Sequence, residues 1–158
     1  MTVNSKIFSS LQDINPSAII ELFTLQLSTA LHGANTIYRF HAGSNLNANG
    51  KIVWAGNEYL RFPVQASGFA FQKGQLPRPK LIISNATGLI SSILLSVNET
   101  TTGNDLTGAT VTRIRTLAKF IDAVNFADGT NATADNTAEF PKEIYSIDRK
   151  ATESREVV

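Results

Sequence analysis

The two histidines are the first side chains in this chain that could do chemistry. His32 and His41 lie nine residues apart, in or beside predicted loops, and no third metal ligand stands out near them. A metal site needs three or four ligands held together, so this pair alone does not define one. We therefore expect both imidazoles to have surface or packing roles, and we predict no metal or cofactor site.

A serine nucleophile has even less support. Ser67 precedes Gly68, but the sequence around it is Ala-Ser-Gly and lacks the Gly-x-Ser-x-Gly pattern of a nucleophile elbow. Nothing in the sequence links either histidine to this serine. Gly103 and Gly108 flank a segment without lysine, so a phosphate-binding loop is also absent.

Paired carboxylates could act as a general acid and base if one cleft held them at a fixed separation. Asp122 and Asp128 are near each other in sequence, and so are Glu139 and Glu143. Solvated turn residues are the simpler interpretation of all four. The sequence therefore predicts no catalytic residue, and the chain is not expected to be an enzyme.

Spaced cations are the most useful polar pattern. On a strand, Arg113 and Arg115 would point the same way, about 7 Å apart, and Lys119 would join their row. Two interpretations stay open: a basic stripe facing a partner or a DNA channel, and a solvated strand face. Arginine pairs bidentately with carboxylates on another chain. We expect partner contacts from this row and from Arg78, which lies in a stiff loop between two prolines.

Composition limits the possible functions further. The chain has 158 residues, 42% hydrophobic and 17% charged, with a formal net charge of +1. Such a charge gives no global case for binding nucleic acid or an anionic membrane. Absence of cysteine excludes disulfides and thiolate metal sites within these residues. The amino terminus has no long apolar run of the signal-peptide type, and no stretch approaches the roughly 20 apolar residues that span a bilayer.

The elements that must position these residues are mainly strands. Residues 18–27 alternate in a way that allows burial on both faces. Residues 51–54 and 57–60 predict a hairpin, with Gly56 at a positive φ and with Trp54 facing Tyr59 across it. Further strands are expected at 36–41, 64–71, 80–84 and 142–153, and loops at 28–35, 42–50, 74–79, 98–108 and 127–137.

Helices are fewer. Residues 5–12 predict a short helix, with Phe8, Leu11 and Ile14 as a stripe at spacings of three. Residues 88–95 fit a helix or a strand, and residues 109–120 combine helical spacing with many β-branched residues. The number of expected strands and helices predicts a mainly β fold, a single β-barrel or sandwich-like domain with one or two short helices. We expect an extension or short helix at 1–16 and one β-rich domain at 17–158.

Several segments, taken in order, resemble phage minor tail protein L, a family of lambda-type tail-tip proteins. The most specific is Phe120-Ile-Asp-Ala-Val-Asn-Phe126. The others are Ser17 to Leu25, Val53-Trp-Ala-Gly-Asn-Glu-Tyr59, Pro63 to Phe69, Arg78-Pro-Lys-Leu-Ile-Ile-Ser-Asn85, Gly88, Gly108 to Arg113, and Gly129.

The resemblance implies a structural tail-tip component, a hub protein between the distal tail protein and the central fibre or receptor-binding protein. It implies a homo-oligomeric ring, a trimer, that lines or closes the tail channel, with DNA only as passing cargo and no stable membrane insertion. The implied location is the tail tip of the virion, after assembly in the host cytoplasm. In that setting residues 109–120 form a long strand, which is the alternative we favour.

One departure from the family affects the cofactor. Family members carry a cysteine-rich carboxy-terminal region that resembles an iron–sulfur-binding domain, and this chain has no cysteine. The cluster is therefore not carried over. We expect either that the chain is part of a longer protein or that its phage lacks the second domain.

Three rival functions stand beside the structural one. The first is a receptor- or carbohydrate-binding β-sandwich, which needs exposed aromatics such as Trp54. The second is a hydrolase of cell-wall material that uses Asp122 or Glu143. The third is nucleic-acid binding, which the low net charge disfavours.

Overall fold

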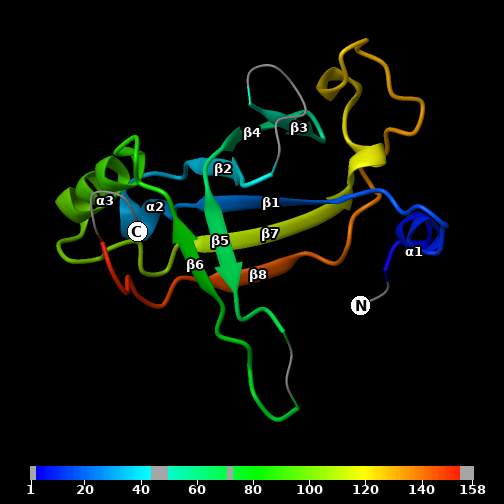
Figure 1. Cartoon of the computed structure of the whole chain (residues 1–158). Coiled ribbons are helices and arrows are strands. Elements are labelled where there is room, and N and C mark those ends of the chain that lie inside the picture. Colours follow the sequence, from blue (N-terminus) through cyan, green and yellow to red (C-terminus); the bar gives the residue numbers. More distant parts are fainter. Residues whose placement is uncertain (1–2, 44–49, 71–72, 154–158) are drawn as a thin grey trace.

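A strongly curled six-stranded sheet, in the form of a half barrel, organises the molecule (Figure 1). The computed structural model describes residues 3–43, 50–70 and 73–153. The sheet has the order β3-β4-β2-β1-β7-β8, and its neighbours are antiparallel except for the parallel pair β2 and β4. The strands are β1 (Ile19–Gln26), β2 (Ile37–His41), β3 (Ile52–Trp54), β4 (Asn57–Arg61), β7 (Thr110–Leu117) and β8 (Glu143–Ser146).

A separate two-stranded ribbon, β5 (Val64–Ser67) with β6 (Lys80–Ile83), crosses the face of this sheet in Figure 1. The helices are α1 (Ser5–Leu11), α2 (Thr29–His32) and α3 (Leu89–Thr100), with short 3₁₀ helices η1 (Ala118–Phe120) and η2 (Ala123–Asn125). Strands dominate, so the prediction of a mainly β fold is confirmed.

Two hydrophobic clusters lie on the sheet, as the alternation in β1 requires. Leu25 belongs to the cluster with β6 and α3, whereas Leu22 belongs to the cluster with the β3–β4 hairpin and the segment after β7. Helix α3 forms because Ile90, Ile93 and Val97 recur at helical spacing and are buried in the first cluster. This settles residues 88–95 as helix.

The short helix α1 is present, but its predicted stripe is wrong. Ile7 is buried in the second cluster, whereas Phe8 is 58% exposed and Leu11 is exposed too. Ile14 lies beyond the helix end and is fully exposed. The residue of this helix that packs into the second hydrophobic cluster is Ile7, which lies outside the predicted stripe.

Other boundaries also shifted. Residues 28–35 contain α2, and α3 extends into the predicted loop 98–108. Residues 109–120 are a strand through Leu117 and then a 3₁₀ turn. Strand β5 ends at Ser67, and β8 ends at Ser146. Most of the predicted loop 42–50, and residue 71 of the predicted strand 64–71, lie outside the described residues.

The β3–β4 hairpin turns through Ala55 and Gly56, both with positive φ (51° and 74°), as a two-residue primed turn requires. Trp54 pairs with Asn57, and Tyr59 pairs with Ile52. Trp54 and Tyr59 are therefore diagonal neighbours rather than a directly opposed pair. Both are buried in the second cluster, at 2% and 3% exposure.

Candidate functional site

Arg113 and Arg115 project from the same face of β7, as their spacing predicts. Register places Glu143 of β8 beside Arg113 and Glu21 of β1 beside Arg115. The Arg113 guanidinium donates to Glu143 at 2.9 Å and to Glu21, and Arg115 reaches Glu143 at 3.4 Å. The basic row is thus neutralised by carboxylates of the chain itself.

Aromatic rings cover this charged cluster. The Arg113 guanidinium lies 4.6 Å from the centroid of Phe69, whose ring meets Tyr145 edge-on. Arg115 lies 5.1 Å from the centroid of Phe140. Burial alone would lower the pKa of Arg113, but its hydrogen bonds to Glu21 and Glu143 outweigh that effect and raise the pKa. The Arg113 guanidinium therefore stays charged.

Lys119 does not join the row, because β7 ends at Leu117 and Lys119 follows in a 3₁₀ turn. Its ammonium lies 3.4 Å from Asp13 and over the Phe120 ring. Arg78 is exposed, in the segment that leads into β6. The structure therefore brings Arg113 and Arg115 together and leaves Lys119 and Arg78 elsewhere. Contact of these residues with a partner stays a prediction.

Replacing Glu143 by glutamine is expected to destabilise the fold by about 1–3 kcal/mol, because two half-buried guanidinium groups lose one carboxylate. Glu58→Gln is the matched control. It removes an exposed pair with Lys51, so it is expected to cost less than about 1 kcal/mol. Urea unfolding of both variants measures the difference, and equal effects would contradict the structural role of Glu143.

Asp122 is part of a second polar cluster, which clamps the β3–β4 hairpin. Its two carboxylate oxygens accept the N–H groups of Ala55 (3.0 Å) and Gly56 (2.8 Å), the two residues of the turn. Asn125 is 1% exposed, accepts from the N–H of Val53 and donates to its carbonyl oxygen, both at 2.7 Å. The segment 120–126 therefore satisfies the outer edge of β3, which has no strand neighbour on that side among the described residues.

The contacts of Asp122 and Glu143 bear on whether paired carboxylates could act as a general acid and base. Both oxygens of Asp122 are engaged by the turn, and Glu143 belongs to the arginine cluster on a different element. No contact joins Asp122 with Asp128, or Glu139 with Glu143, among the interactions of the described residues. None of these four carboxylates is among the residues that line the groove described below.

Both histidines make structural hydrogen bonds. Nδ1 of His32 accepts from the N–H of Ser28 (2.8 Å), and Nε2 lies 3.1 Å from the carbonyl oxygen of Thr107. Nε2 of His41 lies 2.8 Å from the Gly50 carbonyl oxygen, and burial lowers the pKa of this histidine, which favours the neutral ring. Within the residues that the structure describes, no group of three His, Asp or Glu side chains could hold a metal ion.

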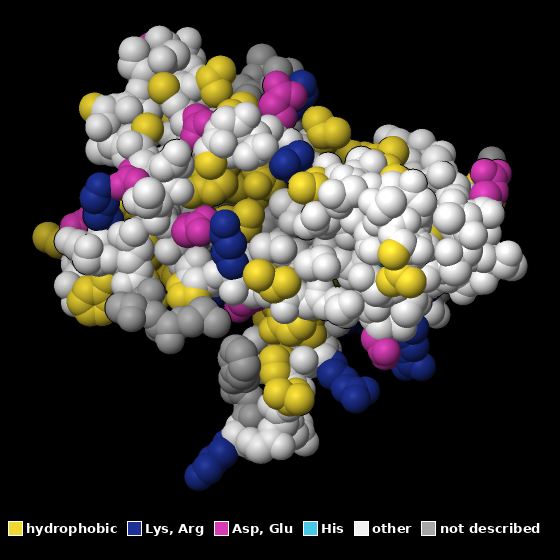
Figure 2. Space-filling model, turned by 180° about the vertical axis from the view of Figure 1, so that it is seen from behind, with side chains coloured by type: hydrophobic (Ala, Val, Ile, Leu, Met, Phe, Trp, Pro, Cys, Tyr) yellow, Lys and Arg dark blue, Asp and Glu magenta, His cyan; other side chains and the backbone are white. Residues whose placement is uncertain are grey.

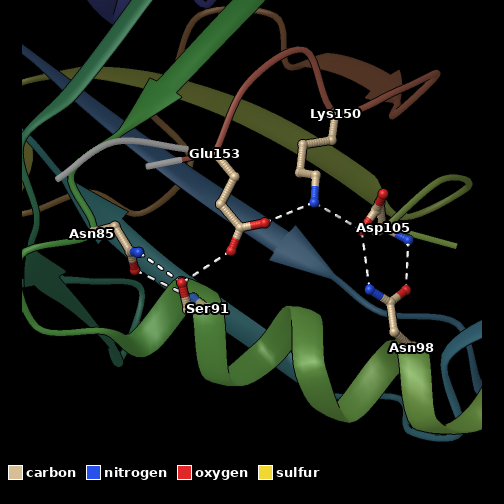
Figure 3. A network of polar contacts seen from close by, with 6 residues as sticks. All are labelled: Asn85, Ser91, Asn98, Asp105, Lys150 and Glu153. Atoms are coloured by element: carbon tan, nitrogen blue, oxygen red, sulfur yellow. Dashed lines mark hydrogen bonds and ion pairs between the residues drawn. The ribbon is translucent and has the colours of Figure 1, made fainter. Parts of the chain in front are cut away.

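A third polar network ties the last described residues to α3 (Figure 3). Lys150 donates to Asp105 at 2.9 Å and to Glu153 at 2.7 Å. Glu153 also accepts from Ser91 of α3, and Asp105 accepts from Asn98 of the same helix. Hydrogen bonds from Asn98 and Lys150 lower the pKa of Asp105, and the Lys150 ammonium lowers the pKa of Glu153.

Acid is expected to release this segment from α3. Because both carboxyl pKa values are lowered from 3.8 and 4.5, the contact is complete above pH 4.5 and is lost as the pH falls through the lowered values. The absence of cysteine allows spin labels at Ser92→Cys and Thr152→Cys, both exposed positions. The measured distance should be narrow at pH 7 and broaden as the pH falls through the lowered pKa values, under conditions where the fluorescence of buried Trp54 shows that the core is still folded.

Lys150→Met is the control for that experiment, because it removes the cation and should broaden the distance already at neutral pH. A distance that stays narrow at pH 2 in a folded chain would contradict the role of the network.

An open groove of about 790 Å³ lies between the β5–β6 ribbon and the last described segment. Its lining includes Leu81 and Ile83 from the ribbon, Ile90 of α3, and Tyr145 and Ile147 after the sheet. Its walls are mostly apolar, but charged side chains also line it, among them Arg78, Lys80 and the ion pair of Asp105 with Lys150. Among the described residues, no helix is long and apolar enough to cross a membrane.

Sequence reasoning missed Asn125 and Lys150, although it named Asp122, whose carbonyl oxygen accepts a hydrogen bond from Asn125. Asn125 lies inside the segment singled out for its resemblance, so that resemblance was the available signal. The contacts of Lys150 join parts of the chain 45 residues apart, for which periodicity provides no signal.

The sequence of this chain is similar to those of known proteins. The family model for phage minor tail protein L matches residues 29–158, which include every strand after β1, the ribbon and all three polar clusters except Glu21. Tail tip protein L of Escherichia phage lambda is 38% identical over 85 residues, which are 53% of this chain and 34% of that protein. The match thus spans about a third of the length of this curated relative.

Proposed function

This chain belongs to the phage minor tail protein L family, and we propose that it is a structural component of the tip of a long, non-contractile tail. It docks between the distal tail protein and the central fibre or receptor-binding protein. Copies form a closed ring, a trimer, that lines or closes the tail channel and through which DNA only passes. The family match over most of the chain is the observation that supports this proposal most.

The use of polar side chains also favours contact over catalysis. Asp122, Glu143, His32 and His41 were the candidates for chemistry, and each makes hydrogen bonds or ion pairs that hold the fold together. A ring contact of ordinary stability buries roughly 1,200–2,000 Å². We propose that exposed surface of the described residues serves such contacts and that the chain turns over no substrate.

The carbohydrate-binding alternative receives no support from Trp54 or Tyr59. Trp54 and Tyr59 are buried in the second hydrophobic cluster, so neither presents a ring face to a sugar. A Trp54→Ala variant would therefore change stability rather than binding.

A nonsense codon in the gene for this chain, in phage grown without a suppressor, tests the proposed function. Particles from this infection are expected to lack complete tails, and supplying the chain from a plasmid should restore them. Supplying Asn136→Ala, a change at an exposed residue, is the matched control and should restore tails equally well. Antibody against the chain should label the tail end distal to the head. Normal infectious particles that lack the chain, or label on the head alone, would contradict the proposal.

A further inference from the structure

We call the β5–β6 ribbon and the described parts of the connection between its strands the arm (residues 64–70 and 73–83). Strands β5 and β6 cross the face of the sheet, whereas the segments after β5 and before β6 extend away from it as a narrow projection in Figure 1. Seen from behind, this projection stands out below the body of the molecule (Figure 2). The projection shows hydrophobic and Lys or Arg side chains in that view.

The arm is a segregated positive charge. Lys73, Arg78 and Lys80 are all exposed, and the sequence has no Asp or Glu between Glu58 and Glu99. None of the ion pairs formed within the described residues involves these three cations. Their charges are therefore available to a partner, unlike those of Arg113 and Arg115.

An apolar side chain stands among these cations. Leu76 is 89% exposed, and Pro77 and Pro79 follow it on either side of Arg78. Proline fixes the backbone on both sides of the arginine, so the segment is held extended before it meets a partner. A leucine surrounded by fixed cations suits a surface in which an apolar recess is bordered by anions.

Close packing anchors the root of the projection, where the segment after β5 meets the segment before β6. Gly68 has a φ of +78°, and a Cβ at this position would lie 3.3 Å from the carbonyl oxygen of Arg78 and 3.4 Å from Cα of Pro79. The two sides of the arm therefore pack closely there. Phe69 contacts Arg113 and Tyr145, so the root rests on the charged cluster of the main sheet.

A second copy of the chain does not offer the complementary surface. Most of its described carboxylates are already in ion pairs within the chain, and Asp122 holds the hairpin turn. The others are Glu99, Asp128 and Asp148, and they lie on three separate segments: α3, the loop after η2, and the segment after β8. No cluster of carboxylates without a cationic partner is formed by these residues.

Phosphate surfaces fit less well. Three cations are few for retention on DNA at physiological salt, since each neutralised phosphate contributes only one step of salt dependence. DNA would also leave Leu76 uncovered. An anionic membrane would cover one leucine but would make no use of an extended segment that is fixed at its root and by two prolines.

We propose that the arm docks into a different tail protein, at a surface where clustered carboxylates border an apolar recess that takes Leu76. Arg78 and Lys80 pair with those carboxylates, and Lys73 adds long-range attraction. This inference rests on the proposed function, because it assigns to one segment of the chain a contact with a neighbour in the tail.

Photo-cross-linking in assembled particles tests it. The chain carries p-benzoylphenylalanine at Leu76 and is supplied to phage that lack their own copy. The matched control carries the same group at Leu95, an exposed leucine (68%) on α3. We expect the Leu76 cross-link, mapped by mass spectrometry, in a peptide of another virion protein in which Asp and Glu outnumber Lys and Arg. Its yield should be at least about tenfold above that from Leu95 to the same peptide.

Charge reversal provides the second variant. Lys73→Glu, Arg78→Glu and Lys80→Glu together are expected to reduce incorporation of the chain into particles at least about tenfold while thermal unfolding of the purified chain is unchanged. Lys73→Arg, Arg78→Lys and Lys80→Arg together should retain incorporation, because all three charges remain.

Each other outcome overturns the proposal. Cross-links from Leu76 to DNA, to lipid or to a second copy identify a different occupant, and a yield no higher than that from Leu95 identifies none. Unchanged incorporation of the charge-reversed chain removes the electrostatic argument. Particles that contain the chain without an arm cross-link reject the arm contact alone. Complete particles that lack the chain reject the proposed function as well.

Discussion

Replacing Phe40 by alanine is expected to destabilise the fold by about 3–5 kcal/mol, the range for a large aromatic residue removed from a packed core. Phe40 is 1% exposed on β2, in the cluster that joins the sheet to β6 and α3. Its ring meets Phe62 edge-on at 5.2 Å, a contact that alanine would lose together with the buried area. Phe40 is almost fully buried in a packed cluster, so relaxation of its surroundings should fill little of the cavity.

Urea unfolding followed by the fluorescence of Trp54 measures this effect. The chain has one tryptophan, and it lies in the other hydrophobic cluster. A shift of its transition by Phe40→Ala therefore also shows that the two clusters unfold together. Phe8→Ala is the control, because Phe8 is 58% exposed and its loss should change stability by less than about 0.5 kcal/mol. A change below about 1 kcal/mol for Phe40→Ala would contradict the assigned core.

Replacing Asn125 by alanine is expected to cost about 2–4 kcal/mol without removing any large apolar group. The side chain makes three hydrogen bonds, two with the backbone of Val53 and one with the carbonyl oxygen of Asp122. Alanine leaves the N–H and carbonyl oxygen of Val53 without their partner, and each such buried group costs about 1–3 kcal/mol. Water has partial access to the edge of β3, so the expected cost stays below the sum of the two upper values.

Asn136→Ala is the matched control for Asn125→Ala, because Asn136 is exposed and should contribute almost nothing. Amide hydrogen exchange adds a local measurement: protection of Val53 and Ala55 should fall more than protection of β1. If both asparagine variants had the same unfolding midpoint, the clamp on the hairpin would have no energetic role.

Strand positions could be predicted from this sequence because burial on both faces leaves a local signature. Leu22 and Leu25, three residues apart, belong to different clusters on opposite faces of β1. The hairpin was equally readable, because Gly56 marks its turn. Residues 88–95 were not, because a run of isoleucine and leucine fits either period. The helix there depends on tertiary burial and on the Asn85 side chain, which accepts the N–H of Ser91.

The polar clusters could not be predicted from local pattern, because they join distant positions. Arg113 pairs with Glu21 across 92 residues, and Asn125 holds Val53 across 72. Spacing showed that Arg113 and Arg115 share a face, but the carboxylates opposite them follow only from strand register. The resemblance selected both 53–59 and 120–126, and the structure supplies the physical link: Asp122 and Asn125 hold the hairpin through its backbone.

These contacts suit a protein that works by presenting fixed surfaces. Polar side chains that could have done chemistry are used to fix the hairpin, the sheet face and the last described segment. The cations of the arm are the clearest exception, since they are exposed and unpaired among the described residues. This combination suits a protein that links other proteins, because a rigid body keeps its contact surfaces in place and unpaired surface charges attract its neighbours.

Cryo-electron microscopy of the tail tip in purified particles tests the central claim most directly. We expect several copies of the six-stranded half barrel in a closed ring around the tail axis, between the end of the tube and the central fibre. A tip reconstruction in which no density fits this sheet, from particles whose mass spectra lack the chain, would contradict the account.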